Sequence, residues 1–282
     1  MTDTSVEEGT PYQLELTARP TRFVPWMREL WAFREVTAIL ARKDFQTKYK
    51  RASFGIVWAV VLPLLQGIVF VVLLTHIGRF SHLGYSYAAF VLAGNLAWAY
   101  FATVAQAAST SIVDNSSMTD KVWFPRTIVA LVPSISNLFG LGTSMLILLA
   151  AMPIVHAHFT WRLWVLIPAI VLMIAFTVAF SLVTAALHVY YRDTKFIVQA
   201  GVLLWFYVTP IIYPAHALGR HIAPWLVLNP MTGIIGLFQF AAAGNFGPMA
   251  HAVLVSVAFT VVFMVIGLQA QRRYDRLFVD LL

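Results

Sequence analysis

A cluster of basic side chains stands directly before the first long apolar stretch. Lys48, Lys50 and Arg51 close a ten-residue segment, Arg42–Arg51, which holds five basic residues and one acid, and the next charged residue is Arg79. Cations at such a junction lie at a membrane surface, where they can bind the anionic headgroup of a lipid as it enters. They can equally anchor the segment on anionic lipid. Both roles are open from the residues alone.

Aromatic side chains form a second set with chemistry of its own, because rings pack on the C–H faces of sugars. They make up 14% of the chain. The rings proposed to line a path are Trp58, Phe70, Trp98, Tyr100, Phe101, Trp205, Phe206 and Tyr207. The alternative is generic, since Trp and Tyr line membrane interfaces and Phe fills lipid-facing surface.

Acids are missing from the apolar segments. Carriers driven by protons or sodium place ionisable groups at membrane depth, yet all twelve Asp and Glu residues lie outside the long uncharged intervals. His76, His188 and His251 lie near the ends of predicted spans and are interpreted as interfacial. A membrane-embedded transferase would need converging Asp, Glu or His and is disfavoured for the same reason. Energy for any pumping must come from elsewhere.

No cofactor or metal site is predicted in this chain. There is no cysteine, which excludes thiolate sites and disulfides, and His156 and His158 have no carboxylate nearby in the sequence. There is no G-x-x-x-x-G-K-[ST] motif, so ATP is not bound here through a P-loop.

The elements that position these groups follow from composition. The chain has 282 residues, of which 60% are hydrophobic and 11% charged, and a mean hydropathy of +0.78. A soluble domain carries about 25% charged residues. Long apolar runs without alternation predict an all-α polytopic membrane protein, and the +7 net charge indicates orientation and lipid contact, with no nucleic-acid partner.

Uncharged intervals predict six transmembrane helices. Their approximate bounds are 55–77, 87–110, 127–150, 163–188, 196–213 and 249–268. Between the fifth and sixth spans, Pro and Gly recur too often for a crossing, so short re-entrant helices on the outer side are expected. The transmembrane domain thus covers 55–268.

The termini are predicted on the cytoplasmic side. With that orientation, sixteen of the nineteen Lys and Arg residues lie inside, as the positive-inside rule requires. Residues 1–24 are expected to form a flexible tail, 25–54 an amphipathic helix at the membrane interface, and 269–282 a second cytoplasmic tail. A soluble helix packed on a partner is the alternative for 25–54.

Two short inner loops are too small to be domains. The first is DNSSMTDKVWFPR (Asp114–Arg126) and the second is YYRDTK (Tyr190–Lys195). Docking on a soluble partner below the membrane is a reasonable role for both, and plain connection is the alternative.

As an ordered set, these features resemble the membrane (permease) subunit of type-2 ABC exporters, in the branch that exports O-antigen, teichoic acid, capsule and galactan precursors. The resemblance covers residues 26–282 and includes Thr209-Pro210, Leu228-Asn229-Pro230 and Arg276–Asp280, where Val279-Asp280 replaces the more usual Ala-Asp. It implies ATPase-coupling loops that contain Asn115, Ser116, Ser117, Met118, Lys121, Phe124, Pro125, Arg126, Tyr191, Arg192 and Asp193.

The resemblance also implies a homodimer with two copies of a separate ABC ATPase, which binds ATP and Mg²⁺. The cargo would be a glycan on a polyprenyl pyrophosphate lipid, moved across the bacterial inner membrane. An exporter of drugs or small lipids from the same superfamily is the alternative, and a scaffold without transport is a third class. The aromatic first and fifth spans and the amphipathic N-terminal helix favour a glycan.

Overall fold

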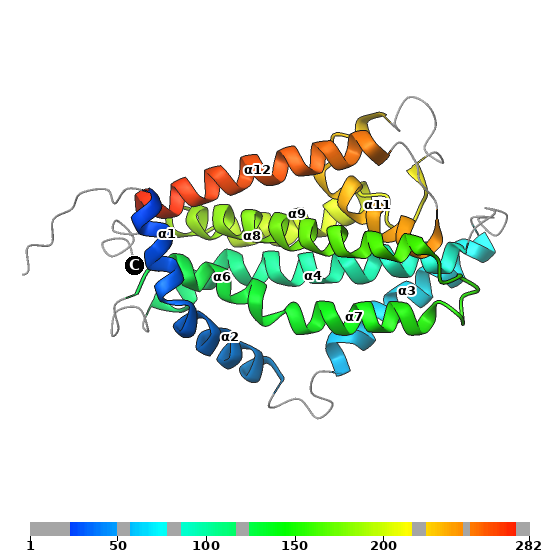
Figure 1. The fold of residues 1–282 in the computed structure, drawn as a ribbon, viewed down its shortest axis with the longest axis horizontal. Coiled ribbons are helices and arrows are strands. Elements are labelled where there is room, and N and C mark those ends of the chain that lie inside the picture. Colours follow the sequence, from blue (N-terminus) through cyan, green and yellow to red (C-terminus); the bar gives the residue numbers. More distant parts are fainter. Residues whose placement is uncertain are drawn as a thin grey trace, which may run out of the picture.

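The computed structural model describes residues 23–49, 57–77, 86–116, 124–215, 224–244 and 249–274. Within these ranges the regular elements are all helices, which confirms the predicted all-α class (Figure 1). In chain order they are α1 (Phe23–Ala32), α2 (Arg34–Tyr49), α3 (Trp58–Ile77), α4 (Tyr87–Asp114), α6 (Thr127–Ser136), α7 (Leu138–Ala151), the 3₁₀ helix η3 (Trp161–Val165), α8 (Leu166–Tyr190), α9 (Thr194–Val208), α11 (Pro230–Ala243) and α12 (Met249–Tyr274).

Among the described residues, four helical segments are long and apolar enough to cross a membrane. They are Tyr87–Asp114, Thr127–Ala151, Trp161–Tyr190 and Ala250–Arg273, and they coincide with four of the six predicted spans. Helix α9 has 15 residues, so it is about 22 Å long, which is less than the ~30 Å hydrocarbon core. The crossing of the membrane by α3 and α9, and hence a total of six spans, remains a prediction.

Helix α4 is the centre of the bundle. It contacts α3, α6, α7, α8, α9 and α11, and most of its 28 residues are buried. Figure 1 shows α4, α8 and α12 running side by side along the long axis of the molecule. A helix that is apolar nearly all round is stable in this way because its neighbours cover most of its circumference.

The third predicted span is two helices. Pro133 lies inside α6 and Asn137 separates α6 from α7. The amide nitrogen of the Asn137 side chain donates to the Pro133 carbonyl at 2.7 Å, and this bond satisfies a backbone group at the interruption. Pro133 lacks the N–H that would bond the Val129 carbonyl, so it weakens the helical turn that precedes the break, a feature that hydropathy alone does not report.

The region between α9 and α12 contains a short helix, as expected. Helix α11 is buried against α4 and α12. Asn229 caps its N-terminus by accepting from the Met231 N–H at 3.0 Å, and Pro230 occupies its first turn. Its re-entrant placement in a membrane remains a prediction.

The predicted amphipathic segment 25–54 begins as two helices. Helices α1 and α2 meet at Phe33, and α2 packs against α6. The interface location of these helices is untested. Residues 1–22 and 50–54 lie outside the described ranges, while Phe23 and Val24, placed in the tail by prediction, begin α1. At the other terminus α12 continues to Tyr274, beyond the predicted boundary at 268.

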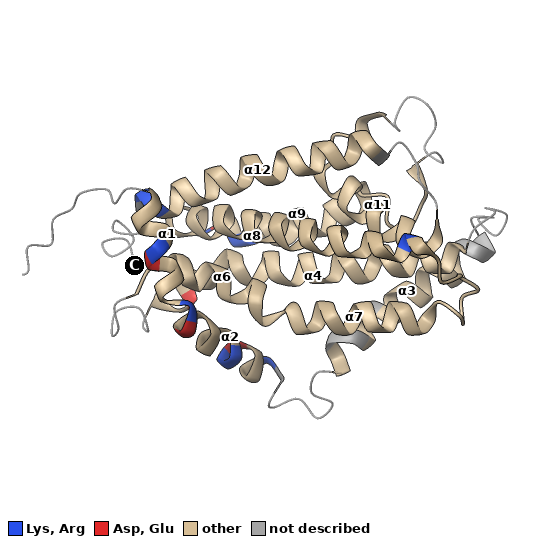
Figure 2. Ribbon diagram, in the orientation of Figure 1, with Lys and Arg blue, Asp and Glu red and all other residues tan. Residues whose placement is uncertain are grey.

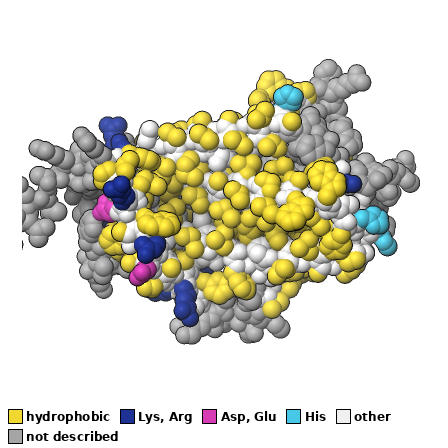
Figure 3. All heavy atoms as spheres, viewed as in Figure 1, with side chains coloured by type: hydrophobic (Ala, Val, Ile, Leu, Met, Phe, Trp, Pro, Cys, Tyr) yellow, Lys and Arg dark blue, Asp and Glu magenta, His cyan; other side chains and the backbone are white. Residues whose placement is uncertain are grey.

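Charged residues gather at one end of the bundle, where α1, α2, the first turn of α6 and the C-terminal turn of α12 lie (Figure 2). We call this the charged end. Figure 3 shows hydrophobic side chains over the middle of the visible face, between the charged side chains and the opposite end. An exposed apolar band with charges beyond it is what a membrane-spanning bundle requires.

Helices α11 and α12 approach each other at a glycine. A methyl group on Gly233 would overlap the Ala252 carbonyl oxygen and the Ser256 hydroxyl. We expect Gly233→Ala to lower the free energy of unfolding by ~1–3 kcal/mol because α12 must move away. Thermal unfolding in detergent measures this effect. Gly140→Ala is the matched control, since its methyl group meets nothing within 4 Å and should stabilise α7 by ~0.5–1 kcal/mol. Equal effects at both glycines would contradict the close approach.

Candidate functional site

The helix ends that flank the two predicted inner loops lie together at the charged end. Ile112 near the end of α4, Ala130 in the first turn of α6 and Val189 at the end of α8 belong to one buried cluster. The helix ends that carry the first loop (α4 and α6) therefore meet the end that carries the second loop (α8). This proximity is a tertiary result, because 63 residues, Thr127–Val189, lie between the two loops in the chain.

The first loop starts from a closed helix end. The Asn115 backbone N–H donates to the Ser111 carbonyl at 3.2 Å, and its side-chain amide donates to the same oxygen at 2.8 Å. These bonds satisfy a carbonyl that the last helical turn leaves free. Ser116 continues the chain half-buried, whereas Ser117, Met118 and Lys121 lie outside the described residues.

The return of the first loop is buried. Phe124 is 6% exposed and Arg126 is 6% exposed, and Pro125 accepts from the Ile128 N–H at 3.0 Å. Phe124 belongs to a buried cluster with α6 side chains, and three residues of the N-terminal helices and their junction pack against this cluster, namely Leu30, Phe33 and Leu40. The cluster that contains Phe124 therefore ties the return of the loop to α1 and α2, a contact that sequence reasoning missed.

The second loop is presented to the outside. Tyr191 is 68% exposed, and Arg192 and Asp193 are also exposed. The Tyr191 carbonyl accepts from the Thr194 N–H at 2.9 Å and from the Thr194 hydroxyl at 2.6 Å, which fixes the turn into α9. An ordered turn with free polar side chains can serve as a docking surface for a soluble partner.

The Asp44 carboxylate links helix α2 to α6. Asp44 pairs with Lys48 at 2.8 Å, and it accepts a hydrogen bond from the buried Ser136 hydroxyl of α6. Among the three predicted headgroup-binding cations, Lys48 thus has a partner within its own helix. Lys50 and Arg51 lie outside the described residues.

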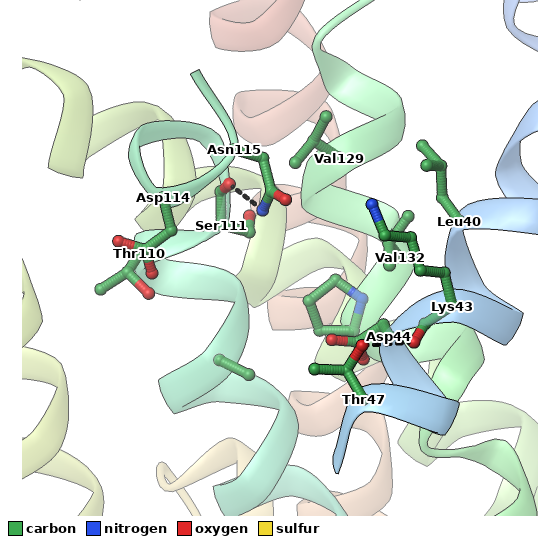
Figure 4. Close-up of a pocket in the computed structure, with 12 residues that line it drawn as sticks. Leu40, Lys43, Asp44, Thr47, Thr110, Ser111, Asp114, Asn115, Val129 and Val132 are labelled. Carbon is green, nitrogen blue, oxygen red and sulfur yellow. Dashed lines mark hydrogen bonds between the residues drawn. The ribbon is translucent and has the colours of Figure 1, made fainter. Parts of the chain in front are cut away.

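A cavity of about 410 Å³ lies among α2, α4 and α6, and both polar and apolar side chains line it (Figure 4). We call it the polar cavity after its charged and hydroxyl groups. Lys43, Asp44 and Thr47 approach it from α2, and Thr110 and Asp114 approach it from α4. The described residues contain no group of three His, Cys, Asp or Glu side chains that could hold a metal ion. Carboxylate, ammonium and hydroxyl groups together suit water or a polar substrate group.

The predicted path aromatics divide into two groups. Trp98, Tyr100, Phe101 and Phe206 are buried. Trp98 makes edge contacts with Phe101 at 5.2 Å and with Phe206 at 5.7 Å between ring centroids. This arrangement makes them part of the core of the subunit.

Two further rings join this core at its edge. The half-buried Trp205 donates its indole N–H to the Asn229 side-chain oxygen at 2.8 Å, and the half-buried Phe70 stacks on Phe206 at 5.7 Å. By contrast, Trp58 is 44% exposed and Tyr207 is 54% exposed. Trp58 and Tyr207 are thus the most exposed of these rings, and the half-buried Trp205 also lines a surface pocket.

Comparisons with a family model and with individual proteins agree on one family. The family model described as ABC-2 type transporter matches residues 35–243. A relative from Myxococcus xanthus, named O-antigen export system permease protein RfbA, is 28% identical over 243 residues, which are 84% of this chain and 92% of that protein. A protein of the same name from Klebsiella pneumoniae is 26% identical over 211 residues, which are 71% of this chain and 77% of that protein.

The contact of the Phe124 cluster with α1 and α2 can be tested directly. We expect Phe124→Ala to cost ~3 kcal/mol of local packing and to speed protease cleavage within residues 23–49, while the protein still inserts into membranes. Limited proteolysis of membrane vesicles, with cleavage sites mapped by mass spectrometry, measures this. Phe159→Ala removes a phenylalanine that is 61% exposed and should leave the cleavage unchanged. Cleavage rates that are equal for both variants would show that Phe124 does not hold these helices.

Proposed function

We propose that this chain, which belongs to the ABC-2 type transporter family, is the membrane-spanning subunit of an ATP-driven polysaccharide exporter. The chain is a transport component, not an enzyme, and a multi-pass protein of the bacterial inner membrane. Family membership implies an ABC ATPase as partner. The proposal rests on the two relatives named O-antigen export permeases, to which the chain is similar over 71% to 84% of its length.

The charged end is the proposed face toward the ATPase. The helix ends that flank its two loops lie together, and the second loop presents Tyr191, Arg192 and Asp193. The first loop is tied through the cluster that contains Phe124 to the N-terminal helices. Movement of a docked ATPase would therefore be transmitted to α4, α6 and α8 through one rigid junction. ATP and Mg²⁺ would be bound by the partner.

A homodimer is the proposed assembly, with α3 and α9 at its interface. Phe70 of α3 stacks on Phe206 of α9, so the two helices are neighbours. Both carry large exposed apolar side chains, together with one exposed glutamine each, Gln66 and Gln199. An amide that faces hydrocarbon is costly, so this face is better suited to a second subunit or to a polar path than to lipid.

The proposed cargo is a glycan carried on a polyprenyl pyrophosphate. The exposed rings of Trp58 and Tyr207 lie on α3 and α9, where they can stack on sugar faces. The buried rings behind them hold these helices in place. Lys48, with Lys50 and Arg51, would receive the pyrophosphate at the inner surface.

Co-purification is the direct test of the proposed complex. An affinity-tagged chain expressed in its native host should bring down an ABC ATPase subunit in equal amount, and deletion of the chain should abolish surface polysaccharide. Arg192→Ala combined with Asp193→Ala should lower the amount of ATPase recovered. Purification of the chain alone, in a host that retains normal surface polysaccharide after the deletion, would contradict the proposal.

The roles of Lys48 and Lys50 can be distinguished by a pair of variants. Lys48→Ala removes the partner of Asp44, which also bonds α6, so we expect reduced stability of the α2–α6 contact as well as reduced export. Lys50→Ala should reduce export without changing assembly, if the basic cluster receives the pyrophosphate. Export is measured by the amount of surface polysaccharide, and assembly by size-exclusion chromatography. Normal export by Lys50→Ala would limit the cluster to anchoring.

A further inference from the structure

Helix α4 carries a narrow polar face in its half nearer the charged end. Thr103 and Gln106 are exposed, Thr110 is half-buried and Asp114 is exposed, at spacings of three and four residues that place them on one side of the helix. The residues between them are mostly buried, as at Val104, Ala105 and Ala108. We call the set of four residues the polar stripe.

The polar stripe is poorly suited to contact with lipid. Neither the Gln106 side-chain amide nor the Thr103 hydroxyl is hydrogen-bonded to another group among the described residues. Leaving such a group without a partner in hydrocarbon is unfavourable. Many other exposed positions in the bundle are apolar, such as Leu146 on α7, which is 68% exposed. The stripe therefore needs water or a polar ligand.

The stripe is continuous with the polar cavity at the charged end. Thr110 and Asp114 belong to both, and Figure 4 shows them beside the cavity, across from Lys43 and Thr47 of α2. Eleven residues separate Asp114 from Thr103, so the stripe extends ~16 Å along the helix, about half of the hydrocarbon core. It offers a polar route from the membrane surface to mid-depth.

We propose that the polar stripe binds the hydroxyl groups of the sugar chain as it enters from the charged end. This inference rests on the proposed function. It places the first part of the path on α4, in addition to the aromatic residues already proposed on α3 and α9. Amide and hydroxyl groups both donate and accept hydrogen bonds, as sugar hydroxyls do. A lipid tail would leave these amide and hydroxyl groups without hydrogen-bond partners. Asp114 is the one charged member of the stripe.

Water access can be measured with single cysteines, because the natural chain has none. Thr103→Cys and Gln106→Cys should react with a membrane-impermeant maleimide added to inside-out vesicles of the full ATPase complex, severalfold faster than the lipid-facing control Leu146→Cys. Reaction no faster than this control would overturn the proposal. A disulfide between two copies through Gln106→Cys would also overturn it, because a second subunit would then cover the stripe.

Export assays distinguish sugar binding by the polar stripe from water access alone. Gln106→Leu and Thr103→Val should lower surface polysaccharide severalfold with unchanged recovery of the ATPase, and Gln106→Asn should restore part of the loss. Gln269→Leu, at an exposed glutamine of α12, is the matched control and should export normally. If the wild-type chain exports polysaccharide and the stripe variants export equally well, the stripe proposal fails and the proposed function stands. If the wild-type chain supports no export, the proposed function itself fails.

Discussion

Polar groups inside an apolar bundle must find partners there, because hydrocarbon offers none. Several side-chain amides meet this requirement at the junctions between helices. Asn229 accepts from Trp205 at 2.8 Å and from the Met231 N–H at 3.0 Å, and it donates to the Thr209 hydroxyl at 3.0 Å. One side chain thus joins the end of α9 to the start of α11. The same requirement places the side-chain amide of Gln239 on α11 against the Pro210 carbonyl at 2.9 Å and that of Gln271 on α12 against the Leu182 carbonyl at 2.9 Å.

The two ends of the bundle consequently differ in character. The end away from the charges is closed by hydrogen bonds between α9, α11 and the start of α4, including one from the Tyr87 hydroxyl to the Ile212 carbonyl at 2.6 Å. The charged end has an exposed turn, a polar cavity and the polar stripe on α4. Such a difference suits a subunit that receives both its energy and its cargo from one side. The junction around Phe124 joins the N-terminal helices to this end through apolar packing.

Much of the architecture could be predicted from the sequence. The uncharged intervals locate the four long helical segments within a few residues, because a run of ~20 apolar residues is long enough to cross a membrane as a helix. The separation of Lys and Arg from the apolar runs marks which helix ends lie together, and Figure 2 shows the same separation in space. The short helix after Asn229-Pro230 follows from the capping preference of Asn and the fit of Pro in a first turn.

The sequence by itself determined the helical class, the approximate positions of the long helices and the charged end, because composition and charge act over whole segments. Only the tertiary structure decided which side of each helix is covered. Trp98 and Phe101 are buried whereas Tyr207 is exposed, and Gln106 is exposed on a helix whose other faces are mostly buried. The break at Asn137 and the contact of the Phe124 cluster with α1 and α2 also depend on neighbouring helices. In helices that are apolar all round, periodicity does not mark an inner face, so burial is set by the neighbours that pack against each side.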